Sequence, residues 1–378
     1  MDFELTEEQR AFQGTVRNFA EKQLAPRAEE VDQKEEFPWE SFKGLAKLGL
    51  TGMTIPQEYG GVGSDEFTLN IAMEEIATAC ASTAHILDSH LVLCSSPIYH
   101  FGDEAQRRKF LPPLAKGEKV GAFGLTEPEA GSDVGNANLR AVKDGDAYIL
   151  NGQKTFISNG EVCKTAIVFA RIPELGAKGM TAFVVEEGMP GFSKGKKFRK
   201  LGMRAATTAE LFFQDCRVPS ENLVGGEGKG IKIALSTLDR GRIGIAAQAV
   251  GIARAVLGKS CEYSNIRVQF GAPISRNQAV SFKLADIATE IEAARFLYYK
   301  AAYLADKGQP FSTNAAMAKV FASELAMKAA TWGIQIFGGY GYMMEYPLQR
   351  YFRDAKVTEI YEGTSEVQRI IISRALCK

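Results

Sequence analysis

The sequence predicts an α+β fold in which two helical regions flank a strand-rich middle region, and three observations predict it. Apolar residues recur with the helical period over residues 6–120. Short runs of β-branched and aromatic residues, separated by Gly and Asp, follow up to residue 225, and long helical periods then return. We therefore expect an all-α domain over 1–121, a β-sheet or barrel domain over 122–225 and a helical domain over 226–378.

The first helical region is indicated by apolar side chains such as Phe12, Val16 and Phe19, which would share one helix face. Thr6 and Gln9 have the spacing of a capping box, so a helix is expected to begin there. Prolines divide the rest of the region into several helices with short loops.

The middle region carries "DGD" at 144–146 between two strand-like runs. A tight hairpin needs positive φ, which Gly145 supplies. No long helix separates successive strands, so an antiparallel sheet or small barrel is predicted.

The last region predicts long helices over 231–263, 279–307 and 314–337. The third is apolar on several faces. Such a helix is normally buried in a bundle core or against another subunit, so an oligomer is expected.

The composition excludes several classes of protein. Forty-five Lys and Arg balance forty-five Asp and Glu, so no net charge favours nucleic acid or an anionic membrane. No long uncharged apolar run and no leader-like N-terminus are present, and a cytoplasmic protein is expected. Six cysteines without a C-x-x-C pair predict reduced thiols and no metal site.

Acid or base catalysis by an Asp or Glu side chain is the kind of catalysis that the sequence favours. No G-x-G-x-x-G follows a predicted strand, which argues against a nicotinamide dehydrogenase. The three histidines, His85, His90 and His100, share one helical region and are interpreted as core or surface residues. Glu362 lies between Tyr361 and Gly363, where desolvation would raise its pKa toward working pH and suit it to act as a base.

The residues after Glu362 predict the start of the last helix. Ser365 and Gln368 have capping-box spacing, and Glu366 would place a negative charge in the first turn, where the helix dipole favours it. Glu362 is expected to lie in the loop before that helix.

Four separated motifs resemble those of the flavin-dependent acyl-CoA dehydrogenases: "FGLTEPEAGSD" at 123–133, "IRVQFGAPI" at 266–274, "QIFGGYGY" at 335–342 and "YEGTSEVQR" at 361–369. Their order and spacing agree over essentially the whole chain. The resemblance implies an acyl-CoA dehydrogenase-like fold with an N-terminal helical domain, a middle antiparallel β domain and a C-terminal four-helix bundle. It also implies FAD as cofactor, an acyl-CoA substrate, an electron-transferring flavoprotein as partner, and a homotetramer built as a dimer of dimers.

The cofactor residues are carried over from these motifs. Those implied on the protomer's own sheet side are Phe123, Leu125, Thr126, Gly131, Ser132, Phe156, Ile157 and Ser158; many relatives have Trp and Thr where this chain has Phe156 and Ser158. Those implied to contact FAD held mainly by the adjacent protomer are Arg267, Phe270, Gln278, Gln335, Ile336, Phe337, Gly338 and Gly339. Thr364, Ser365 and Glu366 are implied as further cofactor contacts.

The resemblance assigns Glu362 as the base that takes the α proton of the thioester while hydride leaves the β carbon for flavin N5. Some relatives carry the base instead before the second Arg of "LDRGR", where this chain has Gly241, which cannot act as a base. Ser132, Asp239, Arg240, Gly241, Arg242 and Gly363 are implied to line the substrate pocket.

Chain length and the segment "CASTAHILDSH" at 80–90 resemble the short-chain, butyryl-CoA-type members most closely. A medium-chain or branched-chain dehydrogenase remains the alternative. An acyl-CoA oxidase, a helical scaffold without catalysis and a DNA-binding relative are more remote. The last would need a basic face, and the longest basic run, "GKKFRK" at 195–200, is expected on a solvated loop.

Overall fold

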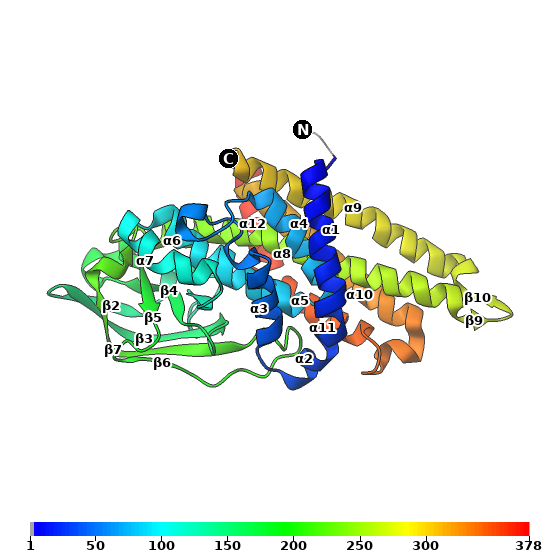
Figure 1. Cartoon of the computed structure of the whole chain (residues 1–378), viewed down its shortest axis with the longest axis horizontal. Helices are drawn as coiled ribbons and strands as arrows, with labels where there is room; N and C mark the ends of the chain where they lie inside the picture. The colour runs from blue at the N-terminus through cyan, green and yellow to red at the C-terminus, as the bar shows by residue number, and fades with distance from the viewer. Residues whose placement is uncertain (1–3, 378) are drawn as a thin grey trace.

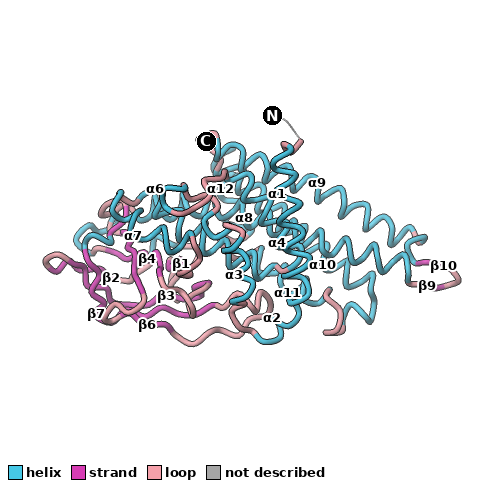
Figure 2. The backbone as a smooth tube through the Cα atoms, viewed as in Figure 1, coloured by secondary structure: helices cyan, strands magenta, loops and turns pink. Residues whose placement is uncertain are grey.

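A computed structural model describes residues 4–377 of the chain. A strand-rich unit lies at one end of an elongated molecule, with α6 and α7 along one side of it and the remaining helices extending toward the other end (Figure 1, Figure 2). The first and last described segments, at the start of α1 and the end of α12, lie on the same side of the molecule in this view (Figure 1). The predicted α+β fold with helical, β and helical regions is confirmed.

The first region contains seven α-helices: α1 (Glu7–Phe19), α2 (Ala28–Lys34), α3 (Trp39–Lys47), α4 (Glu66–Ala79), α5 (Ala81–Leu87), α6 (Ser96–Phe101) and α7 (Glu104–Ala115). The predicted capping box is present, with Gln9 N–H donating to Thr6 Oγ1 at 3.1 Å and Thr6 N–H donating to Gln9 Oε1 at 3.0 Å. A π-helical segment, η5 (Asp88–Ser95), joins α5 to α6 and is buried at every residue.

The sheet has eight strands: β1 (Gly121–Gly124), β2 (Arg140–Asp144), β3 (Ala147–Ser158), β4 (Thr165–Arg171), β5 (Met180–Glu186), β6 (Phe192–Lys194), β7 (Thr208–Pro219) and β8 (Leu223–Val224). Their order is β6-β7-β3-β2-β4-β5-β8, and β1 pairs with β4. The β2–β3 hairpin turns at Gly145, whose φ is 59°, as predicted.

The prediction of a purely antiparallel sheet is wrong at two pairings. Strand β1 runs parallel to β4, and β2 meets β4 in parallel through Arg140 and Arg171. Strand β1 arrives from the helical region and is separated from β4 by the β2–β3 hairpin, so no tight turn forces an antiparallel partner.

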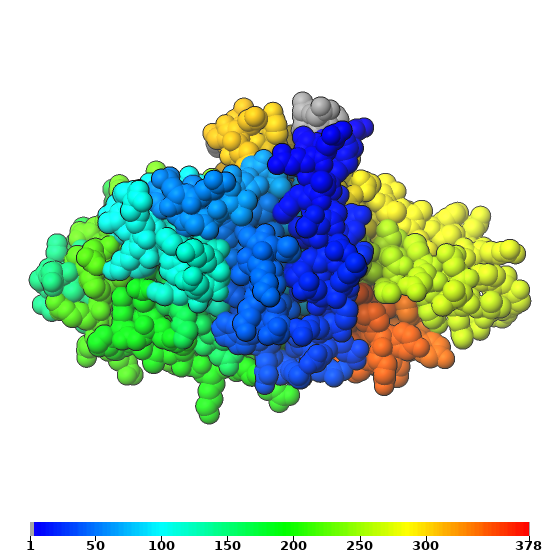
Figure 3. Space-filling view, in the orientation of Figure 1, coloured from blue at the N-terminus to red at the C-terminus, as the bar shows by residue number. Residues whose placement is uncertain are grey.

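The last region contains α8 (Gly230–Ile266), α9 (Gln278–Asp306), α10 (Ser312–Phe337), α11 (Leu348–Thr358) and α12 (Ser365–Leu376). The three long helices begin and end within three residues of the predicted ranges. A short hairpin of β9 (Val268–Gln269) and β10 (Ala272–Pro273) joins α8 to α9 at the end of the molecule opposite the sheet (Figure 1). We call this end, with the turn after α10, the tip; it projects in the space-filling view (Figure 3).

Helix α4 is fixed to the long helices by a buried ion-pair network. The Glu74 carboxylate accepts hydrogen bonds from Arg254 of α8 at 2.7 Å and from Arg295 of α9 at 2.8 Å, and Tyr298 donates to it as well. Several donors on one buried carboxylate offset its desolvation. Helices α4 and α8 are thereby held in the register that places α5 and η5 beside the candidate site.

Within residues 4–377, no helix is long and apolar enough to cross a membrane, and no cluster of His, Cys, Asp and Glu is arranged to hold a metal ion. All six cysteines are free thiols, as predicted. The segment 195–200 does lie on a loop, but the prediction that it is solvated is wrong for Lys200, which is half-buried and donates to Thr208 Oγ1 at 3.0 Å.

Candidate active site

The loop that carries Glu362 is held by its backbone carbonyls. The Glu362 carbonyl accepts from Arg242 Nε at 3.3 Å and Gln368 Nε2 at 3.2 Å. The Gly363 carbonyl accepts from Lys319 Nζ at 2.8 Å and Gln368 Nε2 at 2.7 Å. Glu362 and Gly363 both have positive φ, of 52° and 93°, which is unfavourable for a glutamate. Three side chains from α8, α10 and α12 therefore hold the glutamate in a strained conformation.

The Glu362 carboxylate is shielded from solvent although the residue as a whole is only half-buried. Both of its oxygens lack a hydrogen-bond donor among the residues that the structure describes. Burial raises the pKa of this carboxyl, and the nearby Arg242 and Lys319 charges oppose that rise. The sequence predicted this desolvated setting, which suits a general base.

Asp88, on the π-helical segment η5, faces Glu362, and sequence reasoning missed it. The side chain is 0% exposed, and its carboxyl group lies against the same face of α8 as that of Glu362, close enough for the two groups to interact. Burial and the neighbouring carboxylate raise the pKa of Asp88 well above its ordinary value. One signal was available, since Asp88 is a lone acid in the otherwise uncharged helical run 76–99.

The predicted substrate residues on α8 divide between two faces. Gly241 lies against Glu362, because a Cβ atom there would be 2.0 Å from Glu362 Oε2. Arg242 is buried and pairs with Asp239, which also accepts from Ser312 Oγ at 2.9 Å. Arg240 points elsewhere and donates to Glu66 Oε1 at 2.7 Å. Gly241 and Arg242 thus reach the Glu362 site, and Arg240 does not contact Glu362.

The cap of the last helix lies one residue earlier than predicted. Thr364 is the N-cap, and its Oγ1 accepts from Val367 N–H at 3.3 Å. The Ser365 hydroxyl is buried without a partner among the described residues, and Gln368 holds the loop instead of closing a capping box. Glu366 lies in the first turn, as expected.

The predicted cofactor residues of the middle region gather at the ends of β1 and β3. Phe123 lies in β1, and Leu125 and Thr126 follow it directly. Thr155 N–H donates to the Thr126 carbonyl at 2.9 Å, which fixes this loop beside β3. Gly131 and Ser132 lie further along the same loop and are exposed.

A buried ion pair holds the base of that loop. Lys154 Nζ lies 2.7 Å from Glu127 Oε1, with side chains 0% and 7% exposed. Glu127 also accepts from the backbone N–H groups of Asn138 and Leu139. The loop therefore has a rigid attachment to β3.

Phe156 and Ser158, at the end of β3, present different surfaces. Phe156 has a φ of 56° and is 65% exposed, with its ring centroid 5.2 Å from that of Phe198. Ile157 between them is buried. An exposed aromatic ring held in unfavourable backbone geometry is typical of a surface that covers a planar ligand.

His85 of α5 links this surface to the Glu362 loop. Its Nε2 lies 2.8 Å from Ser158 Oγ, and its ring stacks on Tyr361 with centroids 4.7 Å apart. The Tyr361 hydroxyl donates to Gln248 Oε1. Burial lowers the pKa of His85 to about 3, so the imidazole is neutral at working pH. The interpretation of His85 as a core residue holds, but its contact with Ser158 was not foreseen.

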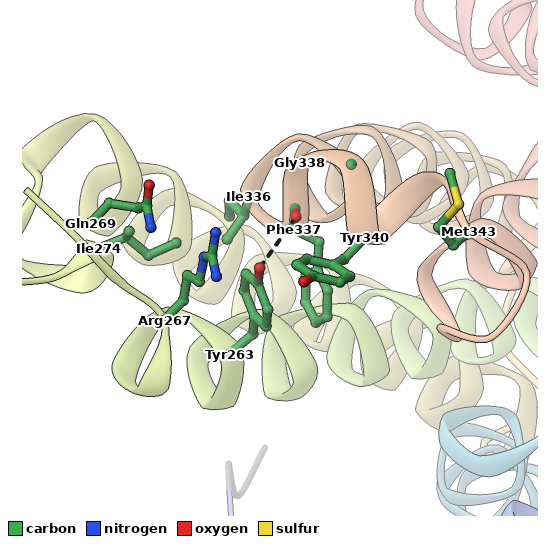
Figure 4. A pocket seen from close by; sticks show the side chains of 10 residues that line it. Tyr263, Arg267, Gln269, Ile274, Ile336, Phe337, Gly338, Tyr340 and Met343 are labelled. Carbon is green, nitrogen blue, oxygen red and sulfur yellow. Dashed lines mark hydrogen bonds between the residues drawn. The ribbon is translucent and has the colours of Figure 1, made fainter.

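The predicted cofactor residues over 267–278 and 335–339 lie at or near the tip, whereas Thr364, Ser365 and Glu366 lie at the start of α12. A cavity of about 520 Å³ is lined there by Tyr263, Arg267, Gln269, Ile274, Ile336, Phe337, Gly338, Gly339, Tyr340 and Met343 (Figure 4). Arg267 lies over the Tyr340 ring at 5.7 Å, and the Tyr263 hydroxyl donates to the Phe337 carbonyl at 3.4 Å. Phe270, at the end of the hairpin, is fully exposed with a φ of 52°. Gln278 begins α9, and Gln335 lies exposed near the end of α10.

The sheet-side residues lie beside α5 and the Glu362 loop, as the His85–Ser158 and His85–Tyr361 contacts show, whereas the tip lies at the end of the molecule opposite the sheet (Figure 1). Their chemistry fits the two parts of a flavin dinucleotide: free hydroxyls and an exposed ring beside the sheet, and a planar cation with aromatic residues at the tip. The hydroxyls of Thr126 and Ser132 make no hydrogen bond within the described residues, so they are available to a ligand.

Comparison with known proteins identifies the family. The chain matches the acyl-CoA dehydrogenase N-terminal domain over residues 6–118, the middle domain over 122–216 and the C-terminal domain over 228–377. A short-chain specific acyl-CoA dehydrogenase of Clostridium acetobutylicum is 50% identical over 374 residues, which are 99% of each chain.

Two solved structures are similar over their full length. Butyryl-CoA dehydrogenase from Megasphaera elsdenii has a TM-score of 0.98 and 50% identity, with 100% of each chain covered. A chain in the structure reported for the electron transferring flavoprotein of Acidaminococcus fermentans, a study of flavin-based electron bifurcation, has the same three values. Because the agreement in sequence and in three dimensions spans all three regions, the chain belongs to the acyl-CoA dehydrogenase family.

Proposed function

We propose that this enzyme catalyses α,β-dehydrogenation of a short-chain acyl-CoA, butyryl-CoA to crotonyl-CoA, or the reverse reduction, with Glu362 as the base. The cofactor of the family is FAD, which when bound takes up a hydride equivalent at its N5. The observation that carries the proposal is the Glu362 carboxylate, desolvated and held on a loop clamped by Arg242, Lys319 and Gln368.

The clamp also supports a second role for Glu362. Its carbonyl is engaged by Arg242 and Gln368, whereas its backbone N–H has no acceptor among the described residues. That N–H is therefore available to bind the thioester carbonyl oxygen as negative charge develops there. A donor of this kind is worth about 3 kcal/mol of barrier.

The preference for a short chain rests on the relatives. The Clostridium acetobutylicum protein is described as short-chain specific, and the Megasphaera elsdenii enzyme as a butyryl-CoA dehydrogenase. A medium-chain or branched-chain substrate is the second candidate. Gly241 disfavours the subtypes that carry their base on α8, because that position has no carboxylate.

We further propose that electrons are exchanged with an electron-transferring flavoprotein and that FAD is completed by a neighbouring protomer in a homotetramer. The Acidaminococcus fermentans structure, which concerns such a flavoprotein, supports the first point. The separation of the two predicted FAD surfaces within one protomer supports the second.

The test is anaerobic addition of butyryl-CoA to the purified holoenzyme, with flavin absorbance as the readout. We expect bleaching in the parent, and its loss in Glu362→Gln with flavin content retained. Glu359→Gln is the matched control, because that carboxylate pairs with Lys356 at 2.6 Å. Unchanged bleaching in Glu362→Gln would defeat the assignment of the base, and faster bleaching by octanoyl-CoA or isovaleryl-CoA would defeat the short-chain preference.

A further inference from the structure

Two glycines of α8 leave space for two carboxyl groups side by side. A Cβ atom at Gly241 would lie 2.0 Å from Glu362 Oε2, and one at Gly244 would lie 2.3 Å from Asp88 Oδ1. The two glycines are three residues apart, so they share one face of the helix. Helix α8 thus approaches both carboxyl groups more closely than a side chain would allow.

Apart from each other, the two carboxyl groups have no polar group of the described residues in hydrogen-bonding position. All four of their oxygens are shielded from solvent and have no donor among the residues that the structure describes. Glu74, in contrast, is equally buried but is bound by Arg254, Arg295 and Tyr298. Two adjacent carboxylates in such a setting cannot both be ionised, because desolvation and mutual repulsion act together.

The surrounding charges indicate which group keeps the proton. Arg242 of α8 and Lys319 of α10 face Glu362 and favour its ionised form. Glu66 of α4 faces Asp88 and disfavours a charge there, while Arg240 is bound to Glu66. The neutral Tyr361 and Asn70 complete the surroundings. Positive charge therefore lies on the Glu362 side and negative charge on the Asp88 side.

We propose that Asp88 is a positioning residue for Glu362: it holds one proton at neutral pH and donates it in a hydrogen bond to the Glu362 carboxylate. The proposal rests on the proposed function, in which Glu362 is the base. The donated hydrogen bond adds to the charges of Arg242 and Lys319 in keeping the buried Glu362 carboxylate ionised.

The proton balance of the pair is simple. Before the reaction the pair carries one proton, on Asp88, and one negative charge, on Glu362. The substrate's α carbon gives up a proton, a new O–H bond forms on Glu362, and the pair becomes neutral with two protons. Asp88 keeps its own proton throughout, so it neither takes part in the bond changes nor replaces Glu362.

The test is the pH dependence of flavin bleaching by butyryl-CoA in the holoenzyme. Asp88→Asn retains a neutral donor of the same shape. We therefore expect the acid limb of its pH–rate profile, where the bleaching rate falls at low pH, to coincide with that of the parent. Asp88→Leu removes the donor, and the acid limb should move up by about one pH unit or more, because the Glu362 carboxylate loses its only hydrogen bond. Asp354→Asn is the control: this buried carboxyl on α11 accepts a hydrogen bond from Met203 N–H and makes none with Glu362 among the described residues, so the acid limb of this variant should stay in place.

Two kinetic outcomes would overturn the proposal. A downward shift in Asp88→Asn would mean that Asp88 is ionised in the parent, because removing a neighbouring charge lowers the pKa of Glu362. An unmoved limb in Asp88→Leu would mean that the two groups are not coupled.

A second measurement does not depend on activity or on the folding of Asp88→Leu. The infrared difference spectrum of parent minus Asp88→Asn, at neutral pH, should contain the carbonyl band of a protonated carboxyl group that shifts in D₂O. Its absence would overturn the proposal. If instead Glu362→Gln bleaches like the parent while this band is present, the assignment of the base fails and the protonated Asp88 stands.

Discussion

The Glu362 carboxylate fills the space that a side chain on residue 241 would need: a Cβ atom there would lie 2.0 Å from Glu362 Oε2. The Glu362 carboxylate can therefore take this position only because residue 241 is a glycine. No positive φ is involved, since Gly241 lies within the regular helix α8, and space alone requires the glycine.

Gly241→Ala should displace the Glu362 carboxylate and slow flavin bleaching by butyryl-CoA about 100-fold, because a shift of about 1 Å at a reacting group has that effect. Rapid-mixing absorbance measures it. Gly258→Ala is the control on the same helix, where a Cβ meets no atom within 4 Å, so it should bleach at the parent rate. Equal rates in both variants would show that the carboxylate is free to move aside.

Removing the His85–Ser158 contact should alter the flavin itself. His85→Phe keeps a ring to stack on Tyr361 but loses the hydrogen bond to Ser158 Oγ. We expect the flavin absorbance and reduction potential to shift by the same amount in His85→Phe, in Ser158→Ala and in the double variant, because groups that act through one contact are not additive. Additive shifts would separate the two residues.

Arg267→Met and Phe270→Ala at the tip should reduce FAD content without unfolding the chain. Phe270 is fully exposed in the protomer and contributes little to its core. Flavin absorbance per chain after gel filtration, with circular dichroism to monitor folding, measures the effect. Val142→Ala, at an exposed position on β2, is the control and should retain FAD. Full flavin content in both tip variants would contradict completion of the site by a neighbour.

Lys154→Met should lower the free energy of unfolding by about 3–5 kcal/mol, because it leaves the buried Glu127 carboxylate without its cation. Chemical denaturation measures the loss. Lys34→Met breaks an exposed pair with Glu30 and should leave stability nearly unchanged. A small effect of Lys154→Met would mean that the backbone donors of Asn138 and Leu139 suffice for Glu127.

Asp354 should make stability depend on pH. Burial raises the pKa of this carboxyl to about 6, so the folded chain binds its proton more tightly than the unfolded chain does. The contribution of Asp354 is thus present at pH 4 and lost as pH rises through 6. Relative to the parent, Asp354→Asn should gain about 2 kcal/mol between pH 4 and pH 7 in denaturation experiments. A pH-independent difference would show that Asp354 is not perturbed.

The periodicity of apolar residues and the positions of turn residues predict much of this fold. The ends of α8, α9 and α10 follow from helical periodicity and from the glycines and prolines between them, and the β2–β3 hairpin follows from "DGD". The parallel pairing of β1 with β4 depends on contacts between segments that are far apart in sequence, which no local signal encodes. Thr364 and Ser365 are adjacent hydroxyl residues, so spacing alone did not decide which one caps α12.

The part of the candidate site that lies within one sequence motif was predictable. Glu362, its loop position and its desolvation follow from the neighbouring residues. Asp88 lies on η5 and His85 on α5, and their roles depend on partners from the loop before α12 and from β3. Sequence reasoning treated that segment as an indicator of the preferred acyl chain length, and only the folded arrangement shows that it faces Glu362.

The distance between the sheet surface and the tip has a consequence for cofactor retention. If each FAD is held by two protomers, occupancy becomes a function of protein concentration, and dilution releases flavin by mass action. A chain damaged only at the tip and a chain damaged only beside the sheet could then complement each other in a mixed assembly, since one pairing of their intact ends rebuilds a complete site.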